Sequence, residues 1–160
     1  MKHLIVGLSS LFPVLGMVLS ARLAAAEDDK AAVTRLLTDY YTAFSTLNVQ
    51  AILPYYLEPS LLISTRGVVA TPTHAALAAT LTPVLEGLRA AGYARSELTM
   101  PHVKRLSVTT ALASGIAVRY KTDEQELERV GVTYLLQKAD DGWKIAALIA
   151  HDADSVLRLE

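Results

Sequence analysis

The last third of the sequence most constrains the fold, because three long β-type segments follow one another with only short, charged turns between them. The segments are residues 111–120, 127–138 and 143–152, and the turns read KTDEQE and ADDG. Short turns join neighbouring antiparallel strands, so this pattern predicts a three-stranded antiparallel sheet. We therefore expect the earlier part of the chain to supply helices that cover the sheet.

The amino terminus has the layout of a secretory signal peptide. Lys2 precedes an apolar run over residues 4–21, and Ala24-Ala25-Ala26 fits a small-residue cleavage site. The alternative is an uncleaved membrane anchor, since the run approaches the minimum spanning length. Pro13 would kink a spanning helix, which favours cleavage. We predict a signal peptide over residues 1–26, cleavage after Ala26, a periplasmic or secreted protein, and no stable membrane insertion afterwards.

Composition limits what the remaining chain can be. The whole chain of 160 residues has a formal charge of −1 and no basic block, which argues against nucleic acid as a partner. It has no cysteine, so disulfides, thiolate chemistry and a lipoprotein anchor are excluded. The length allows one core. We predict a single domain over residues 27–154 and a short tail over residues 155–160.

The middle of the chain predicts helices and two short strands. Apolar residues recur every three or four positions over residues 27–47, which is typical of an amphipathic helix. Further elements follow in the order short helix, two short strands, long helix and long strand, over residues 49–56, 61–65, 67–70, 73–92 and 93–108. Glu58-Pro59 reads as a turn, and Pro83 predicts a kink or a break in the long helix. The full order predicts an α+β domain with an antiparallel sheet.

Three stretches of this order resemble the nuclear transport factor 2-like (NTF2-like) superfamily, which includes SnoaL-like domains and ketosteroid isomerases. They are AAVTRLLTDYYTAF, YYLEPSLLIS with the short helix before it, and the closing hairpin GVTYLLQKADDGWKIAALI. The resemblance covers residues 30–152. It implies a cone-shaped, strongly curved antiparallel sheet wrapped around a pocket and covered by three N-terminal helices, a cystatin-like roll. Members include isomerases, dehydratases, cyclases and non-catalytic binding or dimerising domains.

The catalytic set of ketosteroid isomerases does not carry over to this sequence. Those enzymes use a carboxylate base on the sheet, with a tyrosine and a protonated carboxylic acid as oxyanion donors. Here, the face of the three closing strands that carries the larger residues has no Asp or Glu.

Strand alternation suggests a different set of pocket residues. Tracking the larger residues along each strand places five polar side chains on one face, namely His102, Lys104, Tyr120, Tyr134 and His151. If that face is concave, His151 is the candidate general base, because histidine titrates near neutral pH. The alternative is an exposed strand end without a role. Tyr40 and Tyr56 are further candidate pocket hydroxyls, and the alternative for both is a core tyrosine with a satisfied hydroxyl.

No cofactor or metal site is expected. His102 and His151 are candidates to meet across the sheet, but two histidines without a third ligand make a poor metal site. The sequence also lacks a Gly-rich phosphate loop, a Gly-x-Ser-x-Gly motif and a His-Glu-x-x-His motif.

Two functions therefore stand as hypotheses. The first is an exported domain whose apolar pocket binds a small apolar molecule, with SnoaL-like isomerase or cyclase activity based on His151. The second is a non-catalytic dimerising or protein-interaction module. A homodimer would pack through the small residues of the sheet, which are Ala111, Ala113, Gly115, Ala117, Gly131, Ala146 and Ala150.

Overall fold

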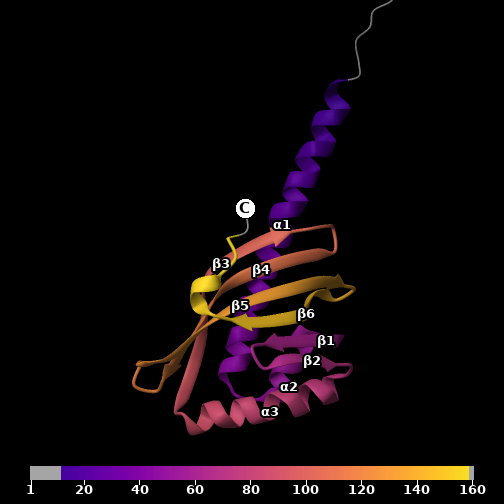
Figure 1. Cartoon of the computed structure of the whole chain (residues 1–160). Helices are drawn as coiled ribbons and strands as arrows, with labels where there is room; N and C mark the ends of the chain where they lie inside the picture. Colours follow the sequence, from indigo (N-terminus) through magenta and orange to yellow (C-terminus); the bar gives the residue numbers. More distant parts are fainter. Residues whose placement is uncertain (1–11, 159–160) are drawn as a thin grey trace, which may run out of the picture.

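A six-stranded sheet with the strand order β2-β1-β6-β5-β4-β3 forms the body of the protein (Figure 1). It is seen in a computed structural model that describes residues 12–158. The strands are β1 Tyr56–Ser64, β2 Gly67–Thr71, β3 Tyr93–Arg105, β4 Thr110–Lys121, β5 Glu126–Ala139 and β6 Gly142–His151.

The sheet is mixed, which corrects the prediction of a wholly antiparallel one. The four hairpin pairs are antiparallel, as the turn chemistry predicts. However, β1 lies parallel to β6, with Ile63 opposite Ile149. These two strands are distant in the sequence, so no turn between them could reveal their relative direction. β1 also contains Glu58-Pro59, which does not form the predicted turn. Its ladder with β6 shifts register between Tyr56 and Leu61, around a proline that has no N–H to donate.

Three α-helices pack with this sheet: α1 Phe12–Ser45, α2 Val49–Ile52 and α3 His74–Ala90. A short 3₁₀ turn, η1 Leu53–Tyr55, continues α2. The side chain of Asn48 accepts a hydrogen bond from the Gln50 N–H and so caps α2. Thr73 caps α3 in the same way, accepting from the Ala76 N–H.

The break predicted at Pro83 does not occur, because α3 is continuous through that residue. Buried leucines lie on both sides of the proline, at positions 77, 81, 85 and 88. Their packing holds the helix together despite the missing N–H.

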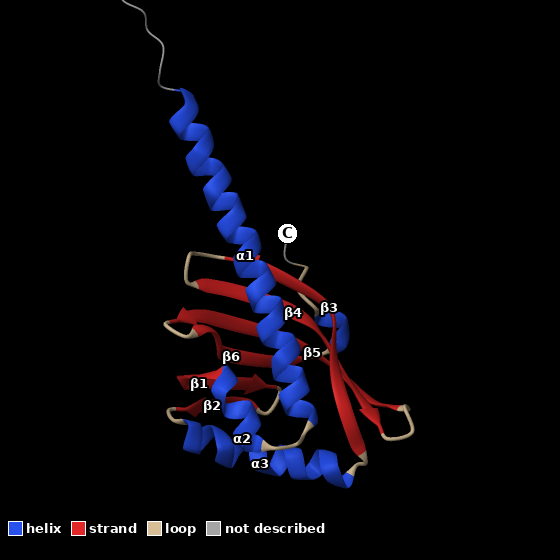
Figure 2. Cartoon of the chain, turned by 180° about the vertical axis from the view of Figure 1, so that it is seen from behind, coloured by secondary structure: helices blue, strands red, loops and turns tan. Residues whose placement is uncertain are grey.

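Helix α1 is longer than predicted. It spans 34 residues and runs through the predicted cleavage site at Ala26. Its N-terminal part extends beyond the sheet (Figures 1 and 2). No helix within residues 12–158 is both long and apolar enough to cross a membrane. Residues 1–11 of the predicted signal peptide and residues 159–160 of the predicted tail lie outside the described residues, and the cleavage stays a prediction.

One face of the sheet packs against α1 and is called the inner face below. Its packing accounts for the small residues of β4. Ala111, Ala113 and Ala117 are buried there in the same core as the tyrosines of α1. Tyr134 of β5 lies opposite Ala113 and contacts α1 through its hydroxyl. Small side chains on β4 leave room for these rings. Ala111, Ala113 and Ala117 of the predicted dimer face are therefore buried in the chain's own core and are not available to a second copy.

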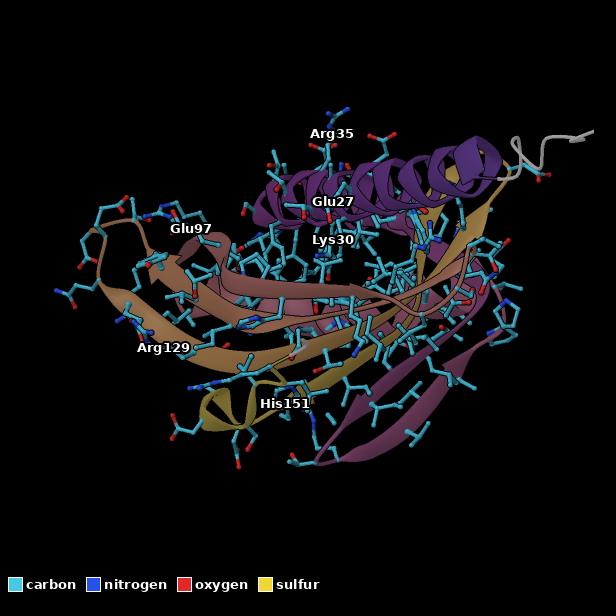
Figure 3. The ribbon with its side chains drawn as sticks, turned by 90° about the horizontal axis from the view of Figure 1, so that it is seen from above. Glu27, Lys30, Arg35, Glu97, Arg129 and His151 are labelled. Atoms are coloured by element: carbon cyan, nitrogen blue, oxygen red, sulfur yellow. The ribbon has the colours of Figure 1, made fainter. Side chains whose placement is uncertain are left out.

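Gly131 confirms that the predicted small-residue set does not share one face. It lies opposite His151, on the side of the sheet away from α1, called the outer face below (Figure 3). A short 3₁₀ turn, η2 Ala153–Ser155, follows β6 on this side and contacts β5.

Candidate functional site

Four tyrosines fill the space between α1 and the inner face. Tyr40 and Tyr41 come from α1, Tyr56 from β1 and Tyr134 from β5, and all four are buried. Their hydroxyls form two hydrogen-bonded pairs: Tyr40 with Tyr56 at 3.1 Å, and Tyr41 with Tyr134 at 2.6 Å. The Tyr40 ring also meets the other three edge-on, at centroid distances of 5.2 to 6.1 Å. This cluster occupies the place where the family resemblance implied a pocket.

Burial keeps these hydroxyls neutral. It raises the pKa of Tyr40 to about 12, although the hydrogen bond with Tyr56 acts in the opposite direction. Burial also raises the pKa values of Tyr41, Tyr56 and Tyr134 well above that of a free tyrosine. A group that stays protonated near neutral pH cannot act there as a general base. The cluster is suited to holding α1 on the sheet.

The predicted pocket residues separate onto two faces. Tyr40, Tyr56 and Tyr134 come together on the inner face, as buried core tyrosines rather than as the lining of a pocket. The remaining three, His102, Tyr120 and His151, lie on the outer face, and Figure 3 shows His151 on the far side of the sheet from α1. The prediction that Tyr134 and His151 share one face is therefore wrong.

Two features of strand pairing cause this separation. The β4–β5 register pairs odd-numbered residues of β4 with even-numbered residues of β5, so Tyr134 lies opposite Ala113 rather than beside Tyr120. In addition, the β5–β6 register shifts between Leu135 and Leu136. One extra residue in a strand reverses the faces of all residues beyond it. Trp143 is therefore in the core, whereas His151 points to the outer face.

His151 is held by hydrogen bonds rather than placed at a cavity. Its Nδ1 lies 2.9 Å from the backbone oxygen of Asp152 and donates to it, since a carbonyl oxygen only accepts. In the neutral ring, Nε2 then accepts from the Thr133 hydroxyl at 3.0 Å. The Thr133 hydroxyl is in turn 2.9 Å from the Ser114 hydroxyl, which accepts the Leu157 N–H at 3.1 Å. This line of side chains ties the C-terminal segment to the outer face.

Gly131 makes this position of the histidine ring possible. A Cβ atom added at Gly131 would overlap both the imidazole of His151 and the backbone oxygen of Asp152. No carboxylate side chain is hydrogen-bonded to the ring among the described residues. The geometry is that of a structural histidine.

Tyr120 and His102, the other two outer-face candidates, are likewise explained by contacts within the sheet. The guanidinium of Arg95 stacks over the Tyr120 ring, 4.1 Å from its centroid, and bonds Glu124 at 2.7 Å and Glu97. His102 lies on the edge strand β3, opposite Ser114 of β4. Strands β4 and β5 therefore separate His102 from His151. Within residues 12–158, no three His, Cys, Asp or Glu side chains are grouped closely enough to hold a metal ion.

A groove of about 500 Å³ lies between α1 and β3. It is lined on the α1 side by Thr34, Leu37, Thr38, Tyr41, Thr42 and Ser45, and on the β3 side by residues 95–99 and Pro101. Leu37, Leu98 and Pro101 make part of it apolar, and threonine hydroxyls line the helix wall. A second groove of about 500 Å³ lies on the other side of α1, where Arg35, Asp39 and Lys144 contribute charge.

The hydroxyls of the α1–β3 groove are oriented by the helix itself. Thr34, Thr38 and Thr42 each donate to the carbonyl four residues earlier, at 2.9 to 3.0 Å. Their protons are used in this way, so their oxygens remain as acceptors. Ser45 at the end of the row accepts the Ser96 N–H at 3.0 Å and so connects α1 to β3.

A family model described as NTF2-like protein (DUF6841) matches residues 27–153. The chain belongs to this family. The superfamily indicated by the sequence resemblance is thereby confirmed. A search of curated proteins gave no match.

Solved structures share the fold of this NTF2-like chain. An NTF2-like protein with a cystatin-like fold from Novosphingobium aromaticivorans is 18% identical with a TM-score of 0.69, over 86% of this chain and 89% of that one. An NTF-2 like protein of unknown function from Shewanella oneidensis is 22% identical with a TM-score of 0.61, over 77% and 98%. A ketosteroid isomerase-like protein from Erwinia carotovora is 17% identical with a TM-score of 0.54, over 75% and 92%. At these identities, the likeness shows the fold alone.

The sequence analysis did not predict the α1–β3 groove. It also did not predict the role of Asp29, which fixes α1 above the sheet. The threonine spacing of four in residues 34–42 is the only signal for the groove in the sequence, and it is equally typical of the polar side of any amphipathic helix. Asp29 of α1 bonds Arg105 of β3 at 2.9 Å and Lys138 of β5 at 2.8 Å. Its side chain is only 10% exposed. The Lys138 and Arg105 hydrogen bonds lower the pKa of Asp29, although burial opposes them.

Proposed function

We propose that this NTF2-like chain is a non-catalytic domain that binds a small amphipathic molecule in the α1–β3 groove. The observation that carries the proposal is the filled interior, where paired tyrosines occupy the space that a pocket would need. The groove of about 500 Å³ has the size of a small-molecule site. It also combines apolar contacts with a few oriented polar atoms, as such sites do.

The groove favours a neutral or cationic ligand that carries hydrogen-bond donors. The threonine oxygens of α1 are acceptors, so they suit a ligand O–H or N–H. Arg95 is already shared between Glu97 and Glu124, so it offers little attraction to an anion. The proposal does not extend to isomerase or cyclase chemistry, because His151 lies on the outer face.

We also infer that the mature protein begins at Glu27 and acts in the periplasm or outside the cell. Asp29, the third residue after the predicted cleavage point, is buried and bonds Arg105 of β3, so this contact belongs to the predicted mature chain. A helix starting at Glu27 would place three acidic residues in its first turn, where the helix dipole favours negative charge.

Native mass spectrometry of protein produced from the full sequence with its own signal, and purified gently, tests these proposals together. A mass that starts at Glu27 and carries a small-molecule adduct is the expected result. An intact mass that includes residues 1–26 would contradict cleavage.

A groove-filling variant locates the binding site. Thr38→Trp places an indole in the groove, whereas Thr82→Trp places one on the exposed side of α3, where the native hydroxyl also bonds the carbonyl four residues earlier. The probe is N-phenyl-naphthylamine, a neutral fluorophore with one N–H donor. Its fluorescence should rise with the wild type and Thr82→Trp but not with Thr38→Trp. An equal rise in all three proteins would exclude this groove as the site.

A further inference from the structure

The two free edges of the sheet differ in charge and shape. The edge strand β3 carries Arg95, Glu97, Lys104 and Arg105, and its ladder is irregular between Thr99 and His102. Charges and irregularities of this kind protect an edge from pairing with another strand. The opposite edge, β2, reads Gly-Val-Val-Ala-Thr and carries no charged residue. It forms the end of the sheet beside β1 (Figure 1).

Exposed apolar side chains gather at this uncharged edge. The structure has six exposed large apolar side chains among the residues it describes, and three of them lie on the β1–β2 hairpin. They are Leu61 at 38%, Val68 at 65% and Val69 at 44% exposure. Val68 and Val69 are neighbours in the strand and point to opposite faces, so both faces of this edge are apolar.

We propose that β2 pairs antiparallel with β2 of a second copy of this chain, across a two-fold axis at Val69. This arrangement sets Val69 against Val69 and Val68 against Ala70, and joins the two six-stranded sheets. Arg66, the nearest charged residue, then lies opposite Pro72 of the second copy rather than another arginine. β-Branched pairs opposite each other stabilise a sheet, whereas opposed like charges destabilise it.

A second copy is the occupant because the strand is complementary to itself. An antiparallel strand pair has a two-fold axis, and the five residues of β2 place only neutral residues against one another in that pair. The strand is short, so the area buried is smaller than in a standard protein interface. We therefore expect a weak dimer that depends on protein concentration. This proposal goes beyond the ligand site, which lies at the opposite edge of the sheet.

Disulfide trapping tests the predicted register. The chain has no cysteine, so a single introduced one reports on one contact. Residues opposite each other in an antiparallel pair have Cα atoms about 4.5–5.5 Å apart, which a disulfide can bridge. Val69→Cys should therefore cross-link under mild oxidation at least tenfold faster than Val108→Cys, whose native side chain is 68% exposed in the β3–β4 loop. Equal rates would mean random collision and would overturn the proposal.

Sedimentation velocity over a concentration series provides the second test. The wild type should shift from monomer to dimer as concentration rises, and Val69→Lys should remain monomeric because two lysines would face each other at the axis. Val108→Lys adds the same charge elsewhere and should dimerise like the wild type. A wild type that stays monomeric at every concentration, or a Val69→Lys protein that still dimerises, would refute edge pairing.

Discussion

The inner and outer faces of the sheet both bury polar side chains, but they use them differently. On the inner face, tyrosine pairs and the Asp29 ion pairs connect α1 to strands β1, β3 and β5. On the outer face, Ser114, Thr133 and His151 connect the sheet to a short C-terminal segment. The inner network is part of the main apolar core, whereas the outer one secures a few terminal residues. The comparison teaches that polar burial alone does not mark an active site, because each network has a structural partner.

The largest effect should follow from emptying the inner face. Tyr134→Ala removes a fully buried ring and leaves the Tyr41 hydroxyl without its partner. We expect the free energy of unfolding to fall by about 3–5 kcal/mol, as for other buried aromatic truncations. Urea denaturation followed by circular dichroism measures this change.

Tyr120→Ala is the matched control on the outer face. Tyr120 is half-buried and its main contact is the stacked Arg95, so we expect a loss of only about 1 kcal/mol. Equal losses for the two tyrosines would mean that the inner face does not dominate stability.

A smaller effect should follow from removing the charge of Asp29. Asp29→Asn weakens the hydrogen bonds to Lys138 and Arg105, and we expect a loss of about 1–3 kcal/mol at neutral pH. Exposed Asp28→Asn is the control and should change stability by less than about 0.5 kcal/mol.

The pH dependence of the Asp29 effect has a defined sign. The pKa of Asp29 is lowered from its ordinary value of 3.8 in the folded protein. Its contribution is therefore complete above the unfolded pKa and is lost as pH falls through the folded pKa. The stability difference between wild type and Asp29→Asn should be constant above about pH 5 and shrink below about pH 4. A difference that grows on acidification would contradict the ion pairs.

The smallest effect should come from the outer face. Ser114→Ala removes the acceptor of the Leu157 N–H. We expect faster amide exchange in residues 153–158 with a change in global stability of about 1 kcal/mol or less. Ser107→Ala, an exposed change in the β3–β4 loop, should leave that exchange unaffected. Unchanged exchange in Ser114→Ala would show that the segment is held by other contacts.

Much of the fold was predictable from local patterns. The hairpins from β3 to β6 followed from alternation and short polar turns, and the two longer helices, α1 and α3, followed from apolar spacing. The direction of β1 against β6 was not predictable, because no turn joins the two strands. The continuity of α3 through Pro83 was also missed, because buried leucines outweighed a local rule.

The candidate site was only half predictable. Tyr40, Tyr56 and Tyr134 come together, but as core tyrosines with paired hydroxyls, which was the alternative to a pocket lining. His151 was assigned to the wrong face, because a register shift inside β6 cannot be seen in a residue pattern. Gly131, which accommodates the His151 ring, lies on the other face from the small residues of β4, because the β4–β5 register pairs it with Ile116.

The sequence by itself determined the α+β class, the closing hairpins and the NTF2-like family, because turns, alternation and family motifs are local properties of a chain. The tertiary structure decided which side chains meet. Strand register and one extra residue in β6 placed Tyr134 under α1 and His151 behind the sheet. Packing of four tyrosine rings then filled the interior and left the groove between α1 and β3 open. These outcomes depend on contacts between distant residues, which a linear pattern does not specify.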